Sequence, residues 1–199
     1  MSDLLTSWGY TIENTDTLPD LMTVAEFDSL TGNKFAGDAR VPQLLASAQI
    51  AVRNFCGWHL YPSLPCKFEA DSINVSRCIQ LPSRFVSGVG SLTLNGEAVL
   101  DYHVKTNGLV FLDGSVLGKS WNDVVVEFSS GLGDSQIGAL KEILAGRIAN
   151  ALTNSYGVQS ESAGGVSITY SLNWASNASA SSITDPLIVA LAPYKVQEV

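Results

Sequence analysis

The residues of this chain that could do chemistry are few, and they centre on one histidine. His59 lies one helical turn after Cys56, the spacing at which a Cys-His pair could act as a nucleophile. Cys66 and Cys78 follow, so the four side chains could also supply the thiolate and imidazole ligands of a zinc site. The spacing matches no known zinc finger, and the sequence has no Cys-x-x-Cys pair. We therefore favour reduced, buried thiols and a hydrogen-bonded core histidine.

Other patterns that are typical of enzymes have simpler explanations here. Gly133-Asp134-Ser135 is similar to the nucleophile block of one hydrolase family, but it stands late in the chain, where a helix needs its cap. The glycine-bearing loops at 88–90 and 162–165 lack the Gly-Lys-Ser/Thr of a phosphate cradle, so we expect turns there. His103 alternates with its neighbours along a strand and should lie at the surface. We predict no catalytic residue, no metal and no cofactor.

The composition indicates a globular protein without a basic face for nucleic acid. The 199 residues are 46% hydrophobic, which is enough for a packed core, and their net charge is −8. An acidic surface does not hold a phosphate backbone, although it suits a channel through which DNA must slide. The first ten residues lack the charged start of a signal peptide, and no apolar run approaches the roughly 20 residues that span a bilayer. We expect a cytoplasmically made protein with no membrane partner.

Apolar residues at helical spacing predict the helix that leads to the histidine. The stripe runs through 41–56, with Pro42 in the first turn, where its missing N–H costs nothing, and Gly57 as the stop. An aromatic corner follows, whose predicted core residues are Phe55, Cys56, Trp58 and His59. Arg53 and Ile50 lie off the stripe on the solvent side. There, Ile50 is either an ordinary exposed residue or a contact for a neighbouring subunit.

Two more helices are predicted on either side of the remaining sequence. The capping box Thr23-Val24-Ala25-Glu26 opens a short helix that ends near residue 31. The stretch 134–157 predicts a long helix with Asp134 or Ser135 as its cap, and Lys141 falls in its apolar stripe, with the ammonium reaching outward to solvent. Small residues on the flank of this helix would let another helix approach closely: Ala139, Gly146 and Ala149.

Between these helices the hydrophobic period changes to two, which predicts β-structure. Short alternating runs occupy 64–128, and the turns Asn95-Gly96 and Asn107-Gly108 between them are typical of hairpins. The run 165–172 predicts one isolated strand, which must pair with the sheet or with a neighbouring chain. A last short helix is expected over 184–193, with Thr184 or Asp185 as its cap.

This order of elements predicts a single α+β domain. It is a small helical bundle with an inserted antiparallel β-sheet or half-barrel of about five or six strands, and with flexible N- and C-terminal arms. Its expected parts are the arm 1–21, the helices 23–62, the β insertion 64–131, the long helix 134–157, and the strand, short helix and tail 165–199.

Several of these stretches, in this order, resemble the head-to-tail connector (adaptor, or head completion) proteins of tailed bacteriophages. The first is the helix opened by Arg40-Val41-Pro42 that ends in Phe55-Cys56-Gly57-Trp58-His59. The others are Leu81-Pro82-Ser83-Arg84, Ser91–Gly96, Val124–Gly131, Arg147–Ala151, Gly157–Glu161, Ser167–Ser171 and Leu191–Tyr194.

The resemblance implies a structural virion protein at the neck, on the portal vertex, assembled in the bacterial host cytoplasm. Such proteins form a ring under the portal, commonly of about twelve copies, that extends the DNA channel and carries the next neck or tail-completion protein. Double-stranded DNA passes through without sequence-specific binding. By analogy the C-terminal residues would contact the portal: Pro193, Tyr194, Lys195 and Val196. The residues expected at subunit contacts are Ile50, Ala139, Gly146 and Ala149.

Three other functions remain open at this stage. The chain could be a tail-completion or terminator protein of the same kind of particle. It could be a module whose sheet binds a small ligand of unknown specificity. It could also be an enzyme, although two histidines and scattered single carboxylates offer little catalytic machinery.

Overall fold

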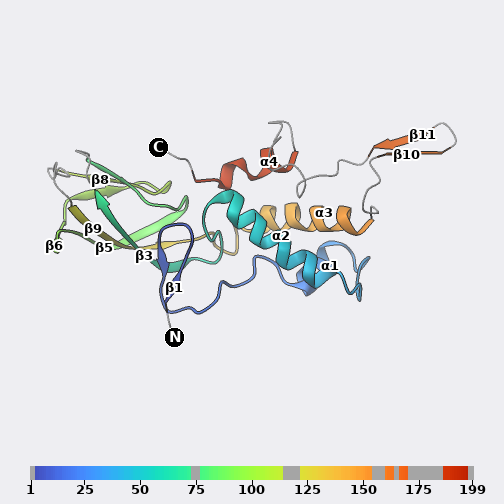
Figure 1. The fold of residues 1–199 in the computed structure, drawn as a ribbon, viewed down its shortest axis with the longest axis horizontal. Coiled ribbons are helices and arrows are strands. Elements are labelled where there is room, and N and C mark those ends of the chain that lie inside the picture. Colours follow the sequence, from blue (N-terminus) through green and yellow to red (C-terminus); the bar gives the residue numbers. More distant parts are fainter. Residues whose placement is uncertain are drawn as a thin grey trace. The chain divides into compact units, whose positions relative to one another are not determined.

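A computed structural model of the chain describes residues 3–72, 77–113, 122–153, 160–163, 166–169 and 186–196 (Figure 1). The fold is α+β, as predicted. The chain divides into two compact units, the first made of 1–21, 52–137 and 194–199, and the second of 22–51 and 138–193. The expectation of a single domain stays a prediction, because this division does not test whether either unit folds alone.

The first unit contains a six-stranded antiparallel sheet in the order β1-β2-β3-β9-β5-β6. Its strands are β1 (Leu4–Leu5), β2 (Thr11–Ile12), β3 (Leu64–Ser72), β9 (Asn122–Ser130), β5 (Val86–Leu94) and β6 (Glu97–Ala98). A separate three-stranded sheet has the order β4-β8-β7. Its strands are β4 (Cys78–Gln80), β8 (Leu109–Leu112) and β7 (Tyr102–Val104). The strands of the β insertion are therefore shared between two sheets, where one was expected.

The N-terminal segment is part of the larger sheet, so the expected arm over 1–21 is wrong for its described residues. Ile12 pairs with Cys66 of β3, and Leu4 pairs with Ile12 across a small hairpin. Tyr10, Ile12 and Leu21 are buried. The segment lacks a clear period because each of its strands is only two residues long, too short for alternation to be visible in the sequence.

Alternation in β3 and β9 places one face of the sheet in the core, because successive residues of a strand lie on opposite faces. The inner residues of β9 are Val124, Val126, Phe128 and Ser130. Asn95 and Gly96 both have positive φ, as the predicted two-residue hairpin turn requires. At the second predicted turn only Gly108 has positive φ, and it is packed against the backbone of Ser83. This hairpin therefore has a longer loop.

Helix α2 (Val41–Cys56) begins and ends where the sequence predicts, but its polar residues do not all face solvent. Gln49 and Arg53 are buried, whereas Ile50 is 60% exposed. In the second unit the Gln49 side-chain oxygen accepts a hydrogen bond from the Met22 N–H at 3.2 Å. Arg53 belongs to the first unit and is described below. The expectation that Arg53 lies on the solvent side was wrong.

The second unit holds α1 (Val24–Leu30), α3 (Gly138–Thr153) and α4 (Pro186–Leu191), and a 3₁₀ turn, Ala192–Tyr194, follows α4. The predicted capping box at the start of α1 is present: the Thr23 hydroxyl accepts from the Glu26 N–H, and the Glu26 carboxylate accepts from the Thr23 N–H. Helix α3 begins at Gly138, so neither Asp134 nor Ser135 is its cap. Its predicted end at Gly157, the caps Thr184 and Asp185, and the tail beyond 196 lie outside the described residues.

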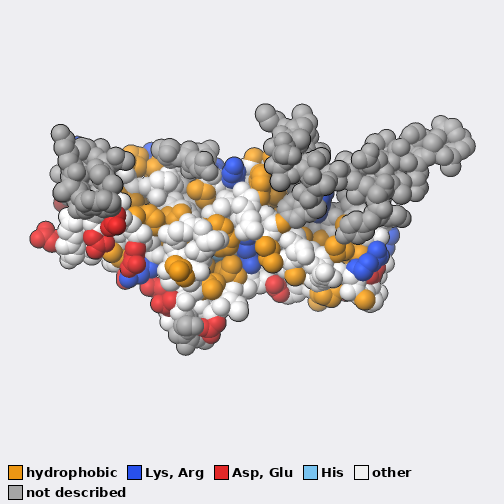
Figure 2. All heavy atoms as spheres, in the orientation of Figure 1, with side chains coloured by type: hydrophobic (Ala, Val, Ile, Leu, Met, Phe, Trp, Pro, Cys, Tyr) orange, Lys and Arg blue, Asp and Glu red, His pale blue; other side chains and the backbone are white. Residues whose placement is uncertain are grey.

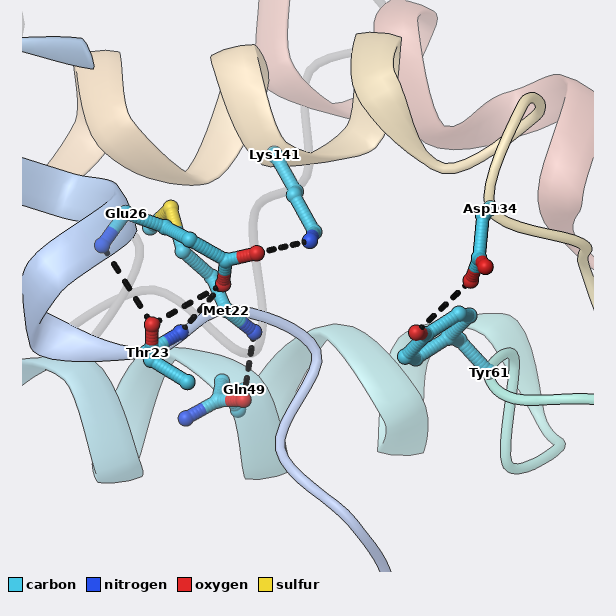
Figure 3. A network of polar contacts seen from close by, with 7 residues as sticks. All are labelled: Met22, Thr23, Glu26, Gln49, Tyr61, Asp134 and Lys141. Carbon is cyan, nitrogen blue, oxygen red and sulfur yellow. Dashed lines mark hydrogen bonds and ion pairs between the residues drawn. The ribbon is translucent and has the colours of Figure 1, made fainter. Parts of the chain in front are cut away.

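Figure 3 shows how α1 and α3 are joined by one ion pair. The Lys141 ammonium donates to the Glu26 carboxylate at 2.6 Å. This hydrogen bond is the main cause of the lowered pKa of Glu26, and the N–H of Thr23 adds to it. Lys141 therefore does not reach outward as the sequence suggested, because it has a carboxylate partner on the neighbouring helix.

The strand expected alone over 165–172 is half of a hairpin. β11 (Val166–Thr169) pairs antiparallel with β10 (Ser160–Ala163), from Ala163 opposite Val166 to Ser160 opposite Thr169. The expectation of an isolated strand is therefore wrong. The sequence did not predict β10, because Ser160–Ala163 has no apolar alternation that marks it as a strand. Within the part of the chain that the structure describes, no helix is both long and apolar enough to cross a membrane.

We predict that Gly131→Ala strongly destabilises the free protein, whereas Gly146→Ala stabilises it. Gly131 has a φ of +140°, and an added Cβ would collide with the backbone of Pro62. We expect a loss of about 2–4 kcal/mol in the free energy of unfolding. Gly146 lies inside α3 with no atom within 4 Å of an added Cβ, so alanine should add up to about 1 kcal/mol through helix propensity.

Urea unfolding of the two variants beside the wild type measures both effects. Equal stability of Gly131→Ala and the wild type would contradict the packing described here.

Candidate functional site

The aromatic corner, Phe55–Pro62, forms where α2 ends and the chain turns into β3. Gly57 has a φ of +78°, which glycine adopts without steric cost, and its N–H donates to the Arg53 carbonyl at 2.8 Å. Trp58 and His59 follow, both fully buried. The Trp58 ring stacks on Phe85 with ring centres 5.8 Å apart. The corner is therefore a packed turn of the first unit with two polar rings in its interior.

His59 uses both ring nitrogens for hydrogen bonds to neighbours from distant parts of the sequence. Nε2 lies 2.9 Å from the Ser130 carbonyl and 3.0 Å from the Pro62 carbonyl. Because a carbonyl can only accept, Nε2 carries the proton and donates to these oxygens. Nδ1 is then the acceptor for the Tyr10 hydroxyl at 2.7 Å, and that hydroxyl in turn accepts from the His59 backbone N–H.

This geometry keeps His59 neutral and chemically inert. Burial lowers its pKa from 6.5 to about 4, because the interior disfavours the imidazolium. Burial likewise raises the pKa of the Tyr10 hydroxyl well above its ordinary value. With both nitrogens occupied, the imidazole has no position from which to take a proton from Cys56. The arrangement therefore stabilises the fold and does not form a Cys-His nucleophile.

The three cysteines do not provide a metal site with His59. Cys56 and Cys66 are buried free thiols, and burial raises the pKa of each to about 12. Cys78 is only half-buried, so the expectation that all three thiols are buried is wrong for it. Among the described residues, no three metal-binding side chains come together as a possible ion site.

Arg53 is the second polar residue buried at the corner. Its guanidinium donates to backbone carbonyls, to His59 at 2.9 Å and to Pro19 at 2.5 Å, with Tyr61 at 3.5 Å. Burial lowers its pKa to about 10, so the group stays charged at neutral pH. Backbone carbonyls satisfy its donors, and in this way one side chain fixes the N-terminal segment and the corner loop together.

The C-terminal segment Tyr194–Val196 is bound to the same corner. The Trp58 indole N–H donates to the Tyr194 carbonyl at 2.6 Å, and the Val196 N–H donates to the Cys56 carbonyl at 2.9 Å. The Lys195 ammonium lies 5.7 Å from the centre of the Phe55 ring, in cation–π range. Sequence reasoning missed this attachment, because a backbone-to-side-chain bond between residues 58 and 194 leaves no periodic signal.

The other residues singled out from the sequence lie at the surface of their units. Ala139 and Gly146 are exposed on α3, and Ala149 is half-exposed there. Asp134 accepts a hydrogen bond from the Tyr61 hydroxyl at 2.9 Å, as Figure 3 shows, and it lies four residues before the start of α3. His103 is at the surface, as predicted, and pairs with Asp113 at 2.8 Å.

Acidic side chains collect on the outer face of the six-stranded sheet. Glu69 and Asp71 of β3 and Asp123 and Glu127 of β9 are exposed, and Asp71 stands directly opposite Asp123, whereas Lys67 on the same face pairs with Glu69. Like charges at opposing positions cost stability, so this pair does not serve the fold. Figure 2 shows acidic groups over the strands on the face in view. A surface of this kind repels polyanions.

No family model and no curated protein matches this chain. A chain from the neck of the native GTA particle, a phage-like gene transfer agent whose neck was computed with C12 symmetry, matches it in structure with a TM-score of 0.52. The two share a fold. The match covers 92% of this chain and 97% of the neck chain, at 14% identity. The shared architecture therefore extends over nearly the whole length of both chains, although few residues are the same.

We predict that acid destabilises the protein partly through His59. The folded state binds the imidazole proton only near pH 4, whereas the unfolded state binds it near pH 6.5, so stability falls as the pH drops through this window. At pH 5 the loss relative to pH 7 should be about 2 kcal/mol. His59→Gln should be less stable at pH 7 but should lose less between pH 7 and 5. His103→Gln, at an exposed site, is the control for removing a histidine, and unfolding by urea at both pH values is the measurement.

We also predict that Trp58→Phe releases the C-terminal segment. Phenylalanine keeps a ring against Phe85 but has no N–H for the Tyr194 carbonyl, and losing that bond should cost about 1–2 kcal/mol. The amide of Val196 should then exchange its hydrogen at least several-fold faster in deuterium-exchange mass spectrometry. Trp8→Phe, elsewhere in the same unit, is the matched control. Unchanged exchange at Val196 in the corner variant would contradict the attachment.

Proposed function

We propose that this chain is a structural protein of the neck of a tailed phage or phage-like particle. One observation carries the proposal: the fold matches a chain of a phage-like neck over nearly the full length of both proteins. That neck was computed with C12 symmetry, which supports a ring of identical subunits here as well. The inert state of His59 and Cys56 fits a role in assembly better than one in catalysis.

In this proposal the protein is a connector between head and tail. Its ring binds the portal protein on one side and the next neck or tail-completion protein on the other, and double-stranded DNA passes through the channel. The acidic outer face of the sheet, which includes Glu69, Asp71 and Asp123, supports a role beside moving DNA, because it would not hold the phosphate backbone. The resemblance in the sequence points to the same role.

The proposed portal contact is the C-terminal segment from Pro193 to Val196. Pro193 and Lys195 are exposed, while the backbone of Tyr194 and Val196 is held by the aromatic corner. The corner would therefore present this segment in a fixed conformation, which lowers the entropy cost of binding.

Contacts between neighbouring subunits are proposed at Ile50 on α2 and at Ala139, Gly146 and Ala149 on α3. Ile50 is a large apolar side chain with 60% of its surface exposed, and Gly146 has open space around it. A large apolar group on one face and small residues on another suit a head-to-tail ring, in which each subunit offers two different surfaces.

We predict that Ile50→Asp and Gly146→Glu prevent neck assembly without unfolding the chain. Both sites are exposed, so the free variants should melt within a few degrees of the wild type. Added to DNA-filled heads that lack this protein, the wild type should restore tail joining, and each variant should restore at least tenfold less. Leu100→Asp, at a residue 87% exposed and outside the proposed contacts, is the matched control.

Deleting the gene separates the proposal from its alternatives. A connector is supported by DNA-filled heads that cannot join tails. Tails of abnormal length on heads with complete necks would instead indicate a terminator protein, and normal infectious particles would refute a neck role.

A further inference from the structure

The hairpin of β10 and β11 forms a sheet of only two strands within the described part of the chain. Its strands, Ser160–Ala163 and Val166–Thr169, have four residues each and form four paired positions. Within the described residues they pair only with one another. A lone two-stranded hairpin is marginally stable in water at best. Among the residues that the structure describes, the outer edge of each strand has no partner strand, so its N–H and C=O groups are available for pairing.

Only one residue of this hairpin, Glu161 on β10, is of a charged type that can protect a strand edge. Natural proteins usually block a free edge with lysine, proline or a bulge. The sequence from 160 to 169 contains neither lysine nor proline, and the register has no bulge. β11 reads Val-Ser-Ile-Thr, and three of these four residues are β-branched types that favour strands. The edges are therefore suited to further strand pairing.

In length, β10 and β11 match each other better than they match the other edge strands that the structure describes. β1 and β6 are two residues long, and β4 and β7 are three, whereas β10 and β11 are both four. Copies related by rotation about a ring axis keep the same up-and-down strand order. β11 of one copy would then meet β10 of the next in antiparallel orientation, and every edge would be used once.

We propose that the β10–β11 hairpins of neighbouring copies join edge to edge into one closed antiparallel β-barrel that holds the ring together. This inference rests on the proposed ring and names the contact that closes it. Full closure leaves no edge, which explains why the hairpin needs neither lysine, proline nor a bulge. The occupant of each edge is a second copy of this chain.

Cross-linking between variants that each carry one added cysteine, beside the buried Cys56 and Cys66, tests the contact directly. In a Cys78→Ser background, variants with one cysteine on β10 (Ser162→Cys or Ala163→Cys) are mixed with variants with one on β11 (Val166→Cys or Ser167→Cys) and assembled into necks. Oxidation should give a covalent dimer in at least one mixture. Each variant alone should give none, because like strands would lie roughly 10 Å apart, too far for a disulfide. Dimers within single-variant samples, or cross-links to another neck protein, would overturn the proposal.

Replacing 160–169 with a glycine-serine linker of equal length supplies the second test. The free variant should melt as the wild type does, and its yield of necks on heads should fall at least tenfold. If this variant assembles normally, the hairpin inference is overturned while the ring stands. If the wild type itself forms no ring on heads, the proposed function fails, so the two failures are distinguishable.

Discussion

The first unit depends on satisfying two polar side chains, His59 and Arg53, that are buried where α2 meets the sheet. A buried imidazole or guanidinium without partners would cost several kcal/mol, so the surrounding chain must bring acceptors to fixed positions. Those acceptors are backbone carbonyls of Pro19, Pro62 and Ser130, from three separate parts of the sequence. Their placement sets the course of the N-terminal segment, the corner loop and the end of β9.

The same corner binds two segments that are far apart in the sequence, the N-terminal segment around Tyr10 and the C-terminal segment around Tyr194. Tyr10 binds His59 from the N-terminal side, and Trp58 binds the carbonyl of Tyr194 from the C-terminal side. Each bond is made in the protein interior or at its edge, where hydrogen bonds are strong and loss of a partner is costly. The neutral state of His59 and the attachment of both segments therefore have the same cause, the hydrogen bonds made at this corner.

The sequence predicted features whose cause is local and missed those whose cause is distant. The stripe of α2, the capping box at Thr23 and the Asn95-Gly96 turn are each determined by a few adjacent residues, and all three are present. The ion pair of Lys141 with Glu26 and the burial of Arg53 depend on partners far along the chain. Periodicity therefore placed Arg53 on the solvent side, and the ammonium of Lys141, although in the apolar stripe, was expected to reach solvent. The exposure of Ile50 on α2 was predictable from the helical period. The attachment of the C-terminal segment to the aromatic corner was not predictable.

The low identity to the neck chain limits what the likeness can say about individual residues. At 14% identity the two chains share a fold, and contacts at particular residues need not be shared. Support for the proposed assembly surfaces therefore comes from the residues of this chain itself. Among the described residues, three features are not explained by packing within one copy: the opposed charges of Asp71 and Asp123, the open space at Gly146, and the strand edges of the β10–β11 hairpin. In the proposed ring, contacts between neighbouring copies would give each of these features a role.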